Sequence, residues 1–193
     1  MSPFRAASAD PTGRASAGHR VIRGDPGASL TLRRQARTIG YRIATTETPH
    51  MLIHGRCHCG NIAFDLGWEP DPTEIPARAC TCSFCVRHGG VWTSNPHAAL
   101  KISVKEPALV SRYVFGTRTA GFHVCARCGA VPVVTSLIDG RLYAVVNVNA
   151  FEGVDPALLR HASASMDGEG EAARLARRVR NWIGDVRYIE TPC

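Results

Sequence analysis

Seven of the eight cysteines in this chain of 193 residues fall between positions 57 and 128, and their spacing restricts the folds available to it. They form three short motifs, followed by a last cysteine at the terminus: Cys57-x-Cys59, Cys80-x-Cys82-x-x-Cys85, Cys125-x-x-Cys128 and Cys193. An odd cluster of seven thiols cannot close into pairs, which argues against a disulfide framework. Thiolate ligands for zinc explain the motifs better, because zinc sites draw on short cysteine spacings of this kind.

Two of the motifs have spacings that let both sulfurs face one ion. In Cys125-x-x-Cys128 the loop reverses, and Gly129 suits the left-handed position at which such a knuckle ends. In Cys57-x-Cys59 an extended backbone places residues i and i+2 on the same face. We therefore expect each motif to supply a pair of metal ligands.

The number of clustered cysteines favours two separate sites. A structural zinc takes four protein ligands, whereas a catalytic zinc typically takes three and leaves one position open for water or substrate. Four plus three uses all seven clustered cysteines. The grouping most consistent with the spacing joins Cys57, Cys59, Cys125 and Cys128, and leaves Cys80, Cys82 and Cys85 as a local, open triad.

The spacing alone leaves two alternatives. Cys80 and Cys82 could share an ion with the Cys125 motif, because that pairing is also stereochemically possible. The triad could also be a second structural site, completed by a histidine such as His88 or His97. A closed site of four protein ligands would leave no position for a substrate.

Composition and charge indicate a folded protein without a membrane segment. Apolar residues make up 45% and charged residues 20% of the chain, no window approaches the roughly 18 apolar residues of a membrane span, and the chain shows no secretory signal pattern. We therefore expect a cytoplasmic location, where a reducing environment keeps thiols free. Residues 1–50 carry eight arginines against three acidic residues, and residues 51–193 carry 15 basic against 13 acidic residues. A nearly neutral core argues against nucleic acid as a partner.

Residues 1–50 are predicted to be a disordered leader or an over-extended start. They are rich in Ala, Ser, Gly, Pro, Thr and Arg, contain no cysteine and show no sustained period of 2 or 3.6. Met51 stands directly before the first cysteine motif. Residues 51–193 are therefore predicted to form a single zinc-binding catalytic domain.

The core is predicted to be mainly β, with an antiparallel meander. Residues 62–66 alternate in apolar character, as the buried face of a strand does. Residues 67–79 include three prolines and are predicted to be a loop. Asp139-Gly140 supplies the positive φ that a tight hairpin needs. Further strands are expected around 102–104, 113–115, 122–124, 131–136 and 142–148.

A short helix is predicted near the C-terminus. Its apolar residues recur at helical spacing and would face the core; they are Ala172, Leu175, Ala176, Val179 and Ile183. Its remaining surface is predicted to be a solvated face that carries Arg174, Arg177, Arg178 and Arg180. Trp92 and Trp182 are interpreted as core anchors.

Three segments in this order carry a resemblance to a known family. They are Gly55-Arg-Cys57-His-Cys59-Gly60-Asn-Ile62-Ala-Phe64, Cys80-Thr-Cys82-Ser83-Phe-Cys85 with Gly89-Gly90 after it, and Phe122-His-Val-Cys125-Ala-Arg-Cys128-Gly129. The chain resembles the family of glutathione-dependent formaldehyde-activating enzymes and centromere protein V from about residue 55 to residue 148. The resemblance implies a β-tent fold of antiparallel strands.

The resemblance also implies how the cysteines divide between two zinc ions. The structural zinc would be held by Cys57, Cys59, Cys125 and Cys128. The catalytic zinc would be held by Cys80, Cys82 and Cys85, which are then the catalytic residues. Val86 follows this triad, where the family commonly has a basic residue.

A reaction follows from the same resemblance. Coordination to zinc deprotonates a thiol, and a thiolate adds readily to an aldehyde. The resembled enzymes join glutathione and formaldehyde to S-hydroxymethylglutathione and are classed, by the reverse reaction, as carbon-sulfur lyases of formaldehyde detoxification. We therefore expect a small thiol such as glutathione, and an aldehyde, as partners. The alternative is a zinc-stabilised binding module without catalysis.

Other polar residues are candidates for contacts to the substrate. Arginine binds carboxylates bidentately, which makes Arg87, Arg112 and Arg118 candidates for the carboxylates of the tripeptide. Histidine titrates near neutral pH, so His88 and His123 are candidates for moving a proton.

Overall fold

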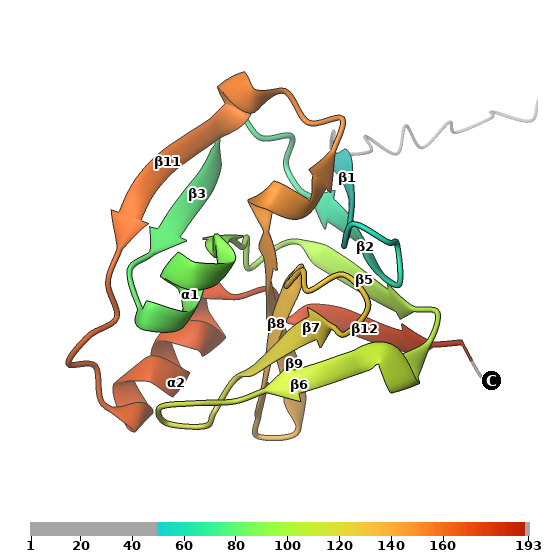
Figure 1. Ribbon diagram of the computed structural model, residues 1–193. Coiled ribbons are helices and arrows are strands. Elements are labelled where there is room, and N and C mark those ends of the chain that lie inside the picture. The colour runs from blue at the N-terminus through green and yellow to red at the C-terminus, as the bar shows by residue number, and fades with distance from the viewer. Residues whose placement is uncertain (1–49, 192–193) are drawn as a thin grey trace, which may run out of the picture. The chain divides into compact units, whose positions relative to one another are not determined.

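The structure is a computed structural model that describes residues 50–191 (Figure 1). Residues 1–49 of the predicted leader, and Cys193, lie outside the described residues. Within the described range the fold is mainly β, as predicted, with two sheets and two α-helices, α1 (Ser83–His88) and α2 (Glu171–Asn181). None of the helices described is long and apolar enough to cross a membrane.

The smaller of the two described sheets has five strands, in the order β10-β1-β2-β5-β12. Burial alternates along β2, where Ile62, Phe64 and Leu66 face the core, and this confirms the strand predicted there. Neighbouring strands are antiparallel except β12, which runs parallel to β5. The strands are β1 (Met51–Arg56), β2 (Ile62–Trp68), β5 (Ala99–Val104), β10 (Phe151–Glu152) and β12 (Asp185–Glu190).

The larger described sheet has seven strands, in the order β11-β3-β4-β9-β8-β7-β6. Its strands β6 to β9 follow one another as the predicted antiparallel meander, and the β8–β9 hairpin turns through Asp139 (φ 48°) and Gly140 (φ 77°). The strands are β3 (Ile75–Cys80), β4 (Val91–Thr93), β6 (Val110–Tyr113), β7 (Gly121–Cys125), β8 (Val133–Ile138), β9 (Arg141–Asn147) and β11 (Leu159–Ala164).

Three strand assignments differ from the sequence prediction. The predicted loop over 67–79 is shorter, because β2 continues to Trp68 and β3 begins at Ile75. Pro76 lies within β3, near the start of the strand, where a missing backbone N–H is tolerated. The prediction at Phe115 is also wrong, since β6 ends at Tyr113. Finally, β11 pairs in parallel with β3, as β12 does with β5, so the sheets are not purely antiparallel.

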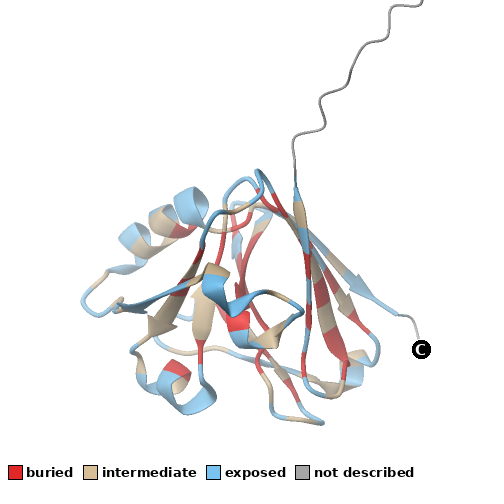
Figure 2. Ribbon diagram, turned by 90° about the horizontal axis from the view of Figure 1, so that it is seen from above, coloured by how far each residue is buried: buried red, intermediate tan, exposed pale blue. Residues whose placement is uncertain are grey.

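One apolar core joins the two sheets. Phe64 and Ile102 from the smaller sheet belong to the same buried cluster as Val133 and Val146 from the larger one. Figure 2 shows buried positions in red along the strands. Two cysteines, Cys57 and Cys125, are also buried in this cluster, with 1% and 0% of their surface exposed. The core therefore ends against the first and third cysteine motifs.

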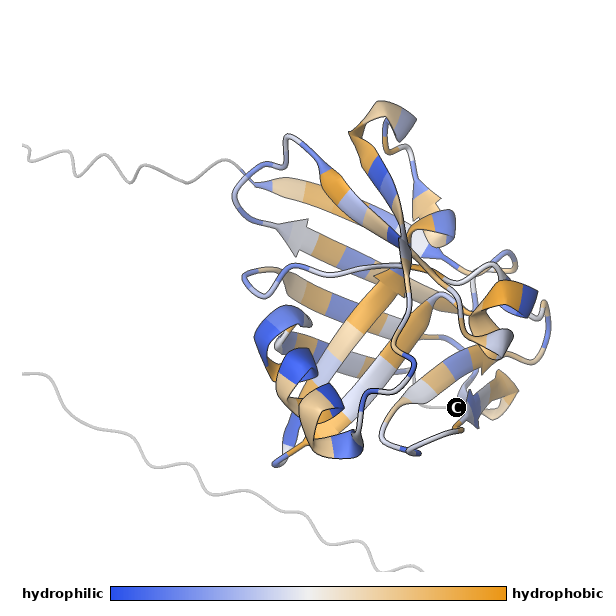
Figure 3. Ribbon diagram, turned by 90° about the vertical axis from the view of Figure 1, so that its left-hand side faces the viewer, coloured by the Kyte–Doolittle hydropathy of each residue, from blue (hydrophilic) through white to orange (hydrophobic). Residues whose placement is uncertain are grey.

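Helix α2 packs with a face other than the predicted one, although Leu175 of the predicted stripe is half-buried. Ala172, Ala176 and Val179 are exposed. Ile183 is buried, but it lies beyond the helix, where it bridges to Ala144. Arg178, predicted to be solvated, is 5% exposed. In Figure 3 the mostly hydrophilic helix lies beside apolar strands of the larger sheet.

Hydrogen bonds explain this orientation. The Nη1 group of Arg178 donates to the carbonyl oxygen of Thr119 at 2.9 Å, to its Oγ1 at 2.8 Å and to Ser136 Oγ at 3.1 Å. The Arg178 guanidinium carbon also lies 4.9 Å from the centre of the Trp182 ring. The methylene groups of an arginine can cover apolar surface while its guanidinium group donates hydrogen bonds to polar atoms. The alanine and valine side chains of the predicted stripe have no hydrogen-bond donors.

Candidate metal centres

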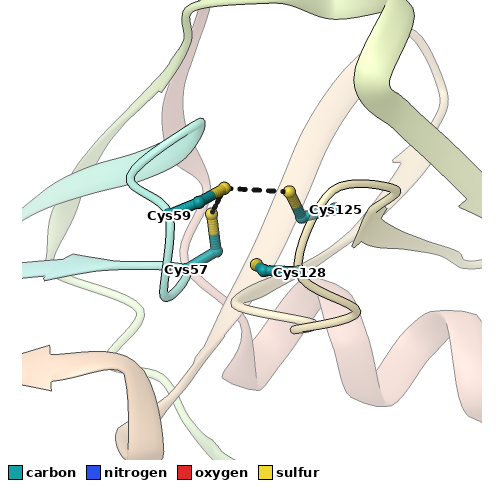
Figure 4. Close-up of side chains that lie close together, drawn as sticks. All are labelled: Cys57, Cys59, Cys125 and Cys128. Carbon is teal, nitrogen blue, oxygen red and sulfur yellow. Dashed lines mark hydrogen bonds between the residues drawn. The ribbon is translucent and has the colours of Figure 1, made fainter.

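The first and third cysteine motifs meet at one end of the two sheets. Cys57 and Cys59 lie in the turn between β1 and β2, Cys125 ends β7, and Cys128 lies in the following knuckle (Figure 4). Their four sulfur atoms all lie within 4.8 Å of one another. Gly129 closes the knuckle at φ 75°, and its N–H donates to the carbonyl oxygen of Cys125 at 2.8 Å. We name Cys57, Cys59, Cys125 and Cys128 the four-cysteine cluster.

The sulfur distances of the four-cysteine cluster fit one tetrahedral ion. Four sulfurs about 2.3 Å from a zinc ion would lie about 3.8 Å apart. The Sγ atoms of Cys57 and Cys59 are 3.7 Å apart, and those of Cys59 and Cys125 are 3.4 Å apart. Burial raises the pKa of the Cys57 thiol to about 12, so a thiolate at this position needs a cation beside it. The donor set and its spacing therefore fit a metal such as zinc.

The second motif forms a separate group where β3 meets α1. Cys80 ends β3, Cys82 is the N-cap residue of α1, and Cys85 lies within this helix. Their sulfur atoms lie within 4.8 Å of one another. The Cys85 N–H donates to Cys82 Sγ at 3.4 Å. We name Cys80, Cys82 and Cys85 the three-cysteine cluster.

Close packing behind the three-cysteine cluster holds Cys85 in place. The indole Nε1–H of Trp92 donates to Cys85 Sγ at 3.3 Å. A Cβ atom on Gly90 would lie 2.8 Å from Cys85 Cβ and 2.9 Å from Trp92 Nε1, so only glycine fits there without a shift. A hydrogen bond from Cys85 lowers the pKa of Cys80 to about 5. The same hydrogen bond raises the pKa of Cys85, so the pair favours a single thiolate, on Cys80, and three thiolates together would need a cation beside them.

The three-cysteine cluster has no fourth ligand in the part of the chain that the structure describes. No histidine, cysteine or carboxylate joins the three sulfurs. His97 is exposed, and the ring of His88 stacks on Phe84 with centroids 4.4 Å apart. The cysteines thus divide as the resemblance implies, and the alternative that pairs Cys80 and Cys82 with the Cys125 motif does not occur in the structure. Their role as metal ligands stays a prediction.

A cavity of about 530 Å³ opens beside the three-cysteine cluster, and all three cysteines line it. Aromatic rings form part of its wall, from Trp92, Phe115, Phe122 and Trp182. Both tryptophans also pack against the small buried cluster of Ala120, Val134 and Val145, so they are core anchors, as predicted, and pocket walls as well. We call this cavity the cysteine pocket.

The polar residues predicted to contact substrate do not line the cysteine pocket. Arg87 Nη1 donates to the carbonyl oxygen of Ser83 on the surface of α1. Arg112 and His123 line a different hollow. Burial, with a smaller contribution from Arg112, lowers the pKa of His123 to about 4, and its Nε2 lies 2.8 Å from Thr135 Oγ1. His123 is therefore neutral and buried, and it lines a hollow that none of the cysteines of the three-cysteine cluster lines, so it is not placed to move a proton there.

Four other arginines line the cysteine pocket, and the sequence analysis did not select them: Arg78, Arg174, Arg177 and Arg178. For three of them, the spacing in the sequence indicates that they lie on one face of the helix. Residues at i, i+3 and i+4 share one helix face, and Arg174, Arg177 and Arg178 have this spacing. Arg78 lies two residues before Cys80 in β3, and alternation along a strand places both on one face.

Comparison with known proteins assigns the chain to a family. The family model described as glutathione-dependent formaldehyde-activating enzyme matches residues 52–161, more than half of the chain. A Rhodobacter sphaeroides protein of known crystal structure is 30% identical, over 53% of this chain and 91% of that chain, with a TM-score of 0.40. None of the curated proteins matches significantly. On the family match, which contains all seven clustered cysteines, the chain belongs to the glutathione-dependent formaldehyde-activating enzyme family.

Proposed function

We propose that this protein is a zinc-dependent carbon-sulfur lyase that activates a small thiol for addition to formaldehyde or a similar electrophile. The observation that carries the proposal is the three-cysteine cluster, which lacks a fourth ligand among residues 50–191 and opens onto the cysteine pocket. Catalytic zinc sites keep such an open position, whereas structural sites are closed. The family match supports the same reaction class.

In this proposal the two clusters have different roles. The four-cysteine cluster holds a structural zinc that ties the β1–β2 turn to the knuckle after β7. The three-cysteine cluster holds the catalytic zinc, which when bound lowers the pKa of an incoming thiol so that it reacts as a thiolate. Residues 51–193 form one catalytic domain, and a cytoplasmic location fits the chemistry because thiols stay reduced there.

The reaction balances without an oxidant or reductant. The sulfur of the thiol forms a bond to the carbonyl carbon of formaldehyde, the C=O π bond breaks, and the proton lost by sulfur ends on the new hydroxyl oxygen. The residues of the chain position the reactants. Trp92 fixes Cys85 by its indole N–H, and aromatic rings form an apolar wall in the same cavity as the sulfur atoms.

Elemental analysis tests the cofactor. Protein purified without added metal is expected to contain two zinc ions per chain, because four and three cysteine sulfurs gather in two separate groups. As a control, the zinc content is measured again after the same protein has been dialysed against a chelator and reloaded with zinc. A single zinc per chain, or the visible absorption of an iron-sulfur cluster, would contradict the assignment.

A rate measurement tests the activity. The exchange between glutathione and S-hydroxymethylglutathione in the presence of ¹³C-formaldehyde can be followed by NMR exchange spectroscopy. The zinc-loaded protein is expected to accelerate adduct formation well above the rate in buffer that contains the same concentration of free zinc. If no thiol tested, glutathione and 3-mercaptopropionate included, reacts faster with the protein than with free zinc, the proposed activity is wrong.

A further inference from the structure

The cysteine pocket carries more positive than negative charge. Four arginines line it, against a single lining carboxylate, Asp167. Glu169, which lies nearby, accepts from Arg177 Nη2 at 2.9 Å and lies 3.9 Å from Arg174 Nε. Among the described residues, no ion pair includes Arg78 or Arg178.

Arg178 is a buried cation with neutral partners only. It is 5% exposed, and its Nη1 group donates to oxygen atoms of Thr119 and Ser136. Its Nε–H is buried and has no hydrogen-bond partner among residues 50–191. Burial, and then repulsion by Arg174 and Arg177, lowers the pKa of Arg178 to about 10. The carboxylate of Glu169 opposes this shift but forms no ion pair with Arg178. Burying a guanidinium without an ion pair is costly, and an anion in the pocket would offset that cost.

Arg78 places a second unpaired guanidinium close to the chemistry. It lies two residues before Cys80 in β3, so that both side chains emerge on one face of the strand and line the same pocket. Arg78 is half-buried and makes no side-chain hydrogen bond or ion pair that the structure records in residues 50–191. Its position lets a ligand reach both an arginine and the three-cysteine cluster.

The rest of the wall is apolar. Trp92, Phe122 and Trp182 line the same cavity as the arginines and the cysteines. Arginine recognises a carboxylate with two parallel N–H donors, whereas an aromatic wall favours the hydrocarbon part of a ligand. The lining therefore combines three cysteine sulfurs, an apolar wall and two arginines that form no ion pair among the described residues.

We propose that Arg78 and Arg178 form a carboxylate site in the cysteine pocket, and that the thiol substrate is one that carries a carboxylate joined to its sulfur by a short apolar body. The part of this inference that concerns the thiol rests on the proposed function. The part that concerns the carboxylate rests on the charge and the burial of the two arginines. Helix α2, which supplies Arg178, begins at Glu171, after the segment that the family model matches ends at residue 161. The anion site is therefore built in part outside the matched segment.

Calorimetry on the full-length, zinc-loaded protein tests the site with two pairs of probes. The first pair is 3-mercaptopropionate and 3-mercaptopropionamide, which are similar in size and differ in that the amide has no negative charge and has an NH2 group in place of one oxygen. The second pair, 3-phenylpropionate and 3-phenylpropionamide, carries no thiol. Because charge-assisted hydrogen bonds to arginine are lost in the amides, the carboxylate of each pair is expected to bind about tenfold more tightly or better.

Three single substitutions test which arginines cause the preference for the carboxylate over the amide. Arg78→Gln and Arg178→Gln are each expected to reduce the preference for the carboxylate severalfold and to leave the affinity for the amides unchanged. Arg180→Gln is the matched control, because Arg180 is an exposed arginine of α2 outside the pocket lining, and it should keep the full preference. If Arg178→Gln does not fold, Arg78→Gln decides alone.

The outcomes separate this inference from the proposed function. Equal affinity for carboxylate and amide in the unmodified protein, or a preference that survives in both Arg78→Gln and Arg178→Gln, overturns the carboxylate site. If the 3-phenylpropionate pair shows the arginine-dependent preference but no thiol reacts with formaldehyde, the site stands and the proposed function fails. If thiols react but carboxylates have no advantage, the function stands and the site fails.

Discussion

Cys125→Ser is expected to abolish cooperative folding of the domain. Cys125 is fully buried, belongs to the main core cluster and belongs to the four-cysteine cluster that joins strands of both sheets. A structural zinc site contributes about 10–16 kcal/mol of apparent binding free energy, which equals or exceeds the roughly 5–15 kcal/mol that stabilises a whole domain. Circular dichroism during heating should show no cooperative transition, and the zinc content should fall.

The control for this substitution is Ala126→Ser. Ala126 is the exposed neighbour of Cys125 in the same knuckle and receives the same new side chain. It should melt like the unmodified protein, because its side chain points to solvent and holds no metal. A Cys125→Ser protein that melts cooperatively at the temperature of the control would show that the four-cysteine cluster does not hold the fold together.

Cys82→Ser is expected to leave a folded protein with one zinc and no activity. The three-cysteine cluster joins only the end of β3 to the first residues of α1, so its metal connects a short segment of the chain. Cys82 is also the N-cap residue of α1, and serine is among the best residues at that position. The helix therefore keeps its cap, and the melting temperature should change by only a few degrees. The rate of adduct formation should fall to that of free zinc.

Thr81→Ser provides the comparison for Cys82→Ser. Thr81 is exposed and adjacent to Cys82, and serine keeps its hydroxyl, which donates to the carbonyl oxygen of Ala164 at 3.4 Å. This variant should keep two zinc ions and full activity. If Cys82→Ser unfolds as completely as Cys125→Ser does, both clusters are structural, and the binding module without catalysis is the better account.

The local features of the fold could be predicted from the sequence because they depend on neighbouring residues. The alternation in β2 and the Asp139-Gly140 hairpin are local patterns, and the structure confirms both. The parallel pairings of β11 with β3 and of β12 with β5 were not predicted. Each joins strands that are distant in the chain, and such register is set by the packed core rather than by a turn.

At the candidate site, too, the sequence predicts one part and not the other: it predicts the cysteine groups but not the arginines of the pocket. Sulfur atoms must converge on an ion, so short spacings such as Cys80-x-Cys82 restrict the possible groups. The arginines of α2 need not converge on one ion, so their spacing does not show which of them face the pocket. Because charged residues are mostly exposed, the sequence predicts that the apolar stripe through Ala176 and Val179 is the buried face. In the structure Arg178 is buried instead, because its guanidinium group donates to oxygen atoms of Thr119 and Ser136, which lie outside α2.

The proposed function depends on a metal at the three-cysteine cluster with a position open to a thiol. Cobalt(II) in place of zinc tests it directly, since absorption bands from sulfur-to-cobalt charge transfer report the number of bound thiolates. Adding glutathione or 3-mercaptopropionate to the cobalt protein should intensify these bands, because one of the two ions gains a fourth sulfur, and Cys82→Ser should show no such change. A spectrum of the unmodified protein that stays the same at saturating concentrations of both thiols would contradict the claim.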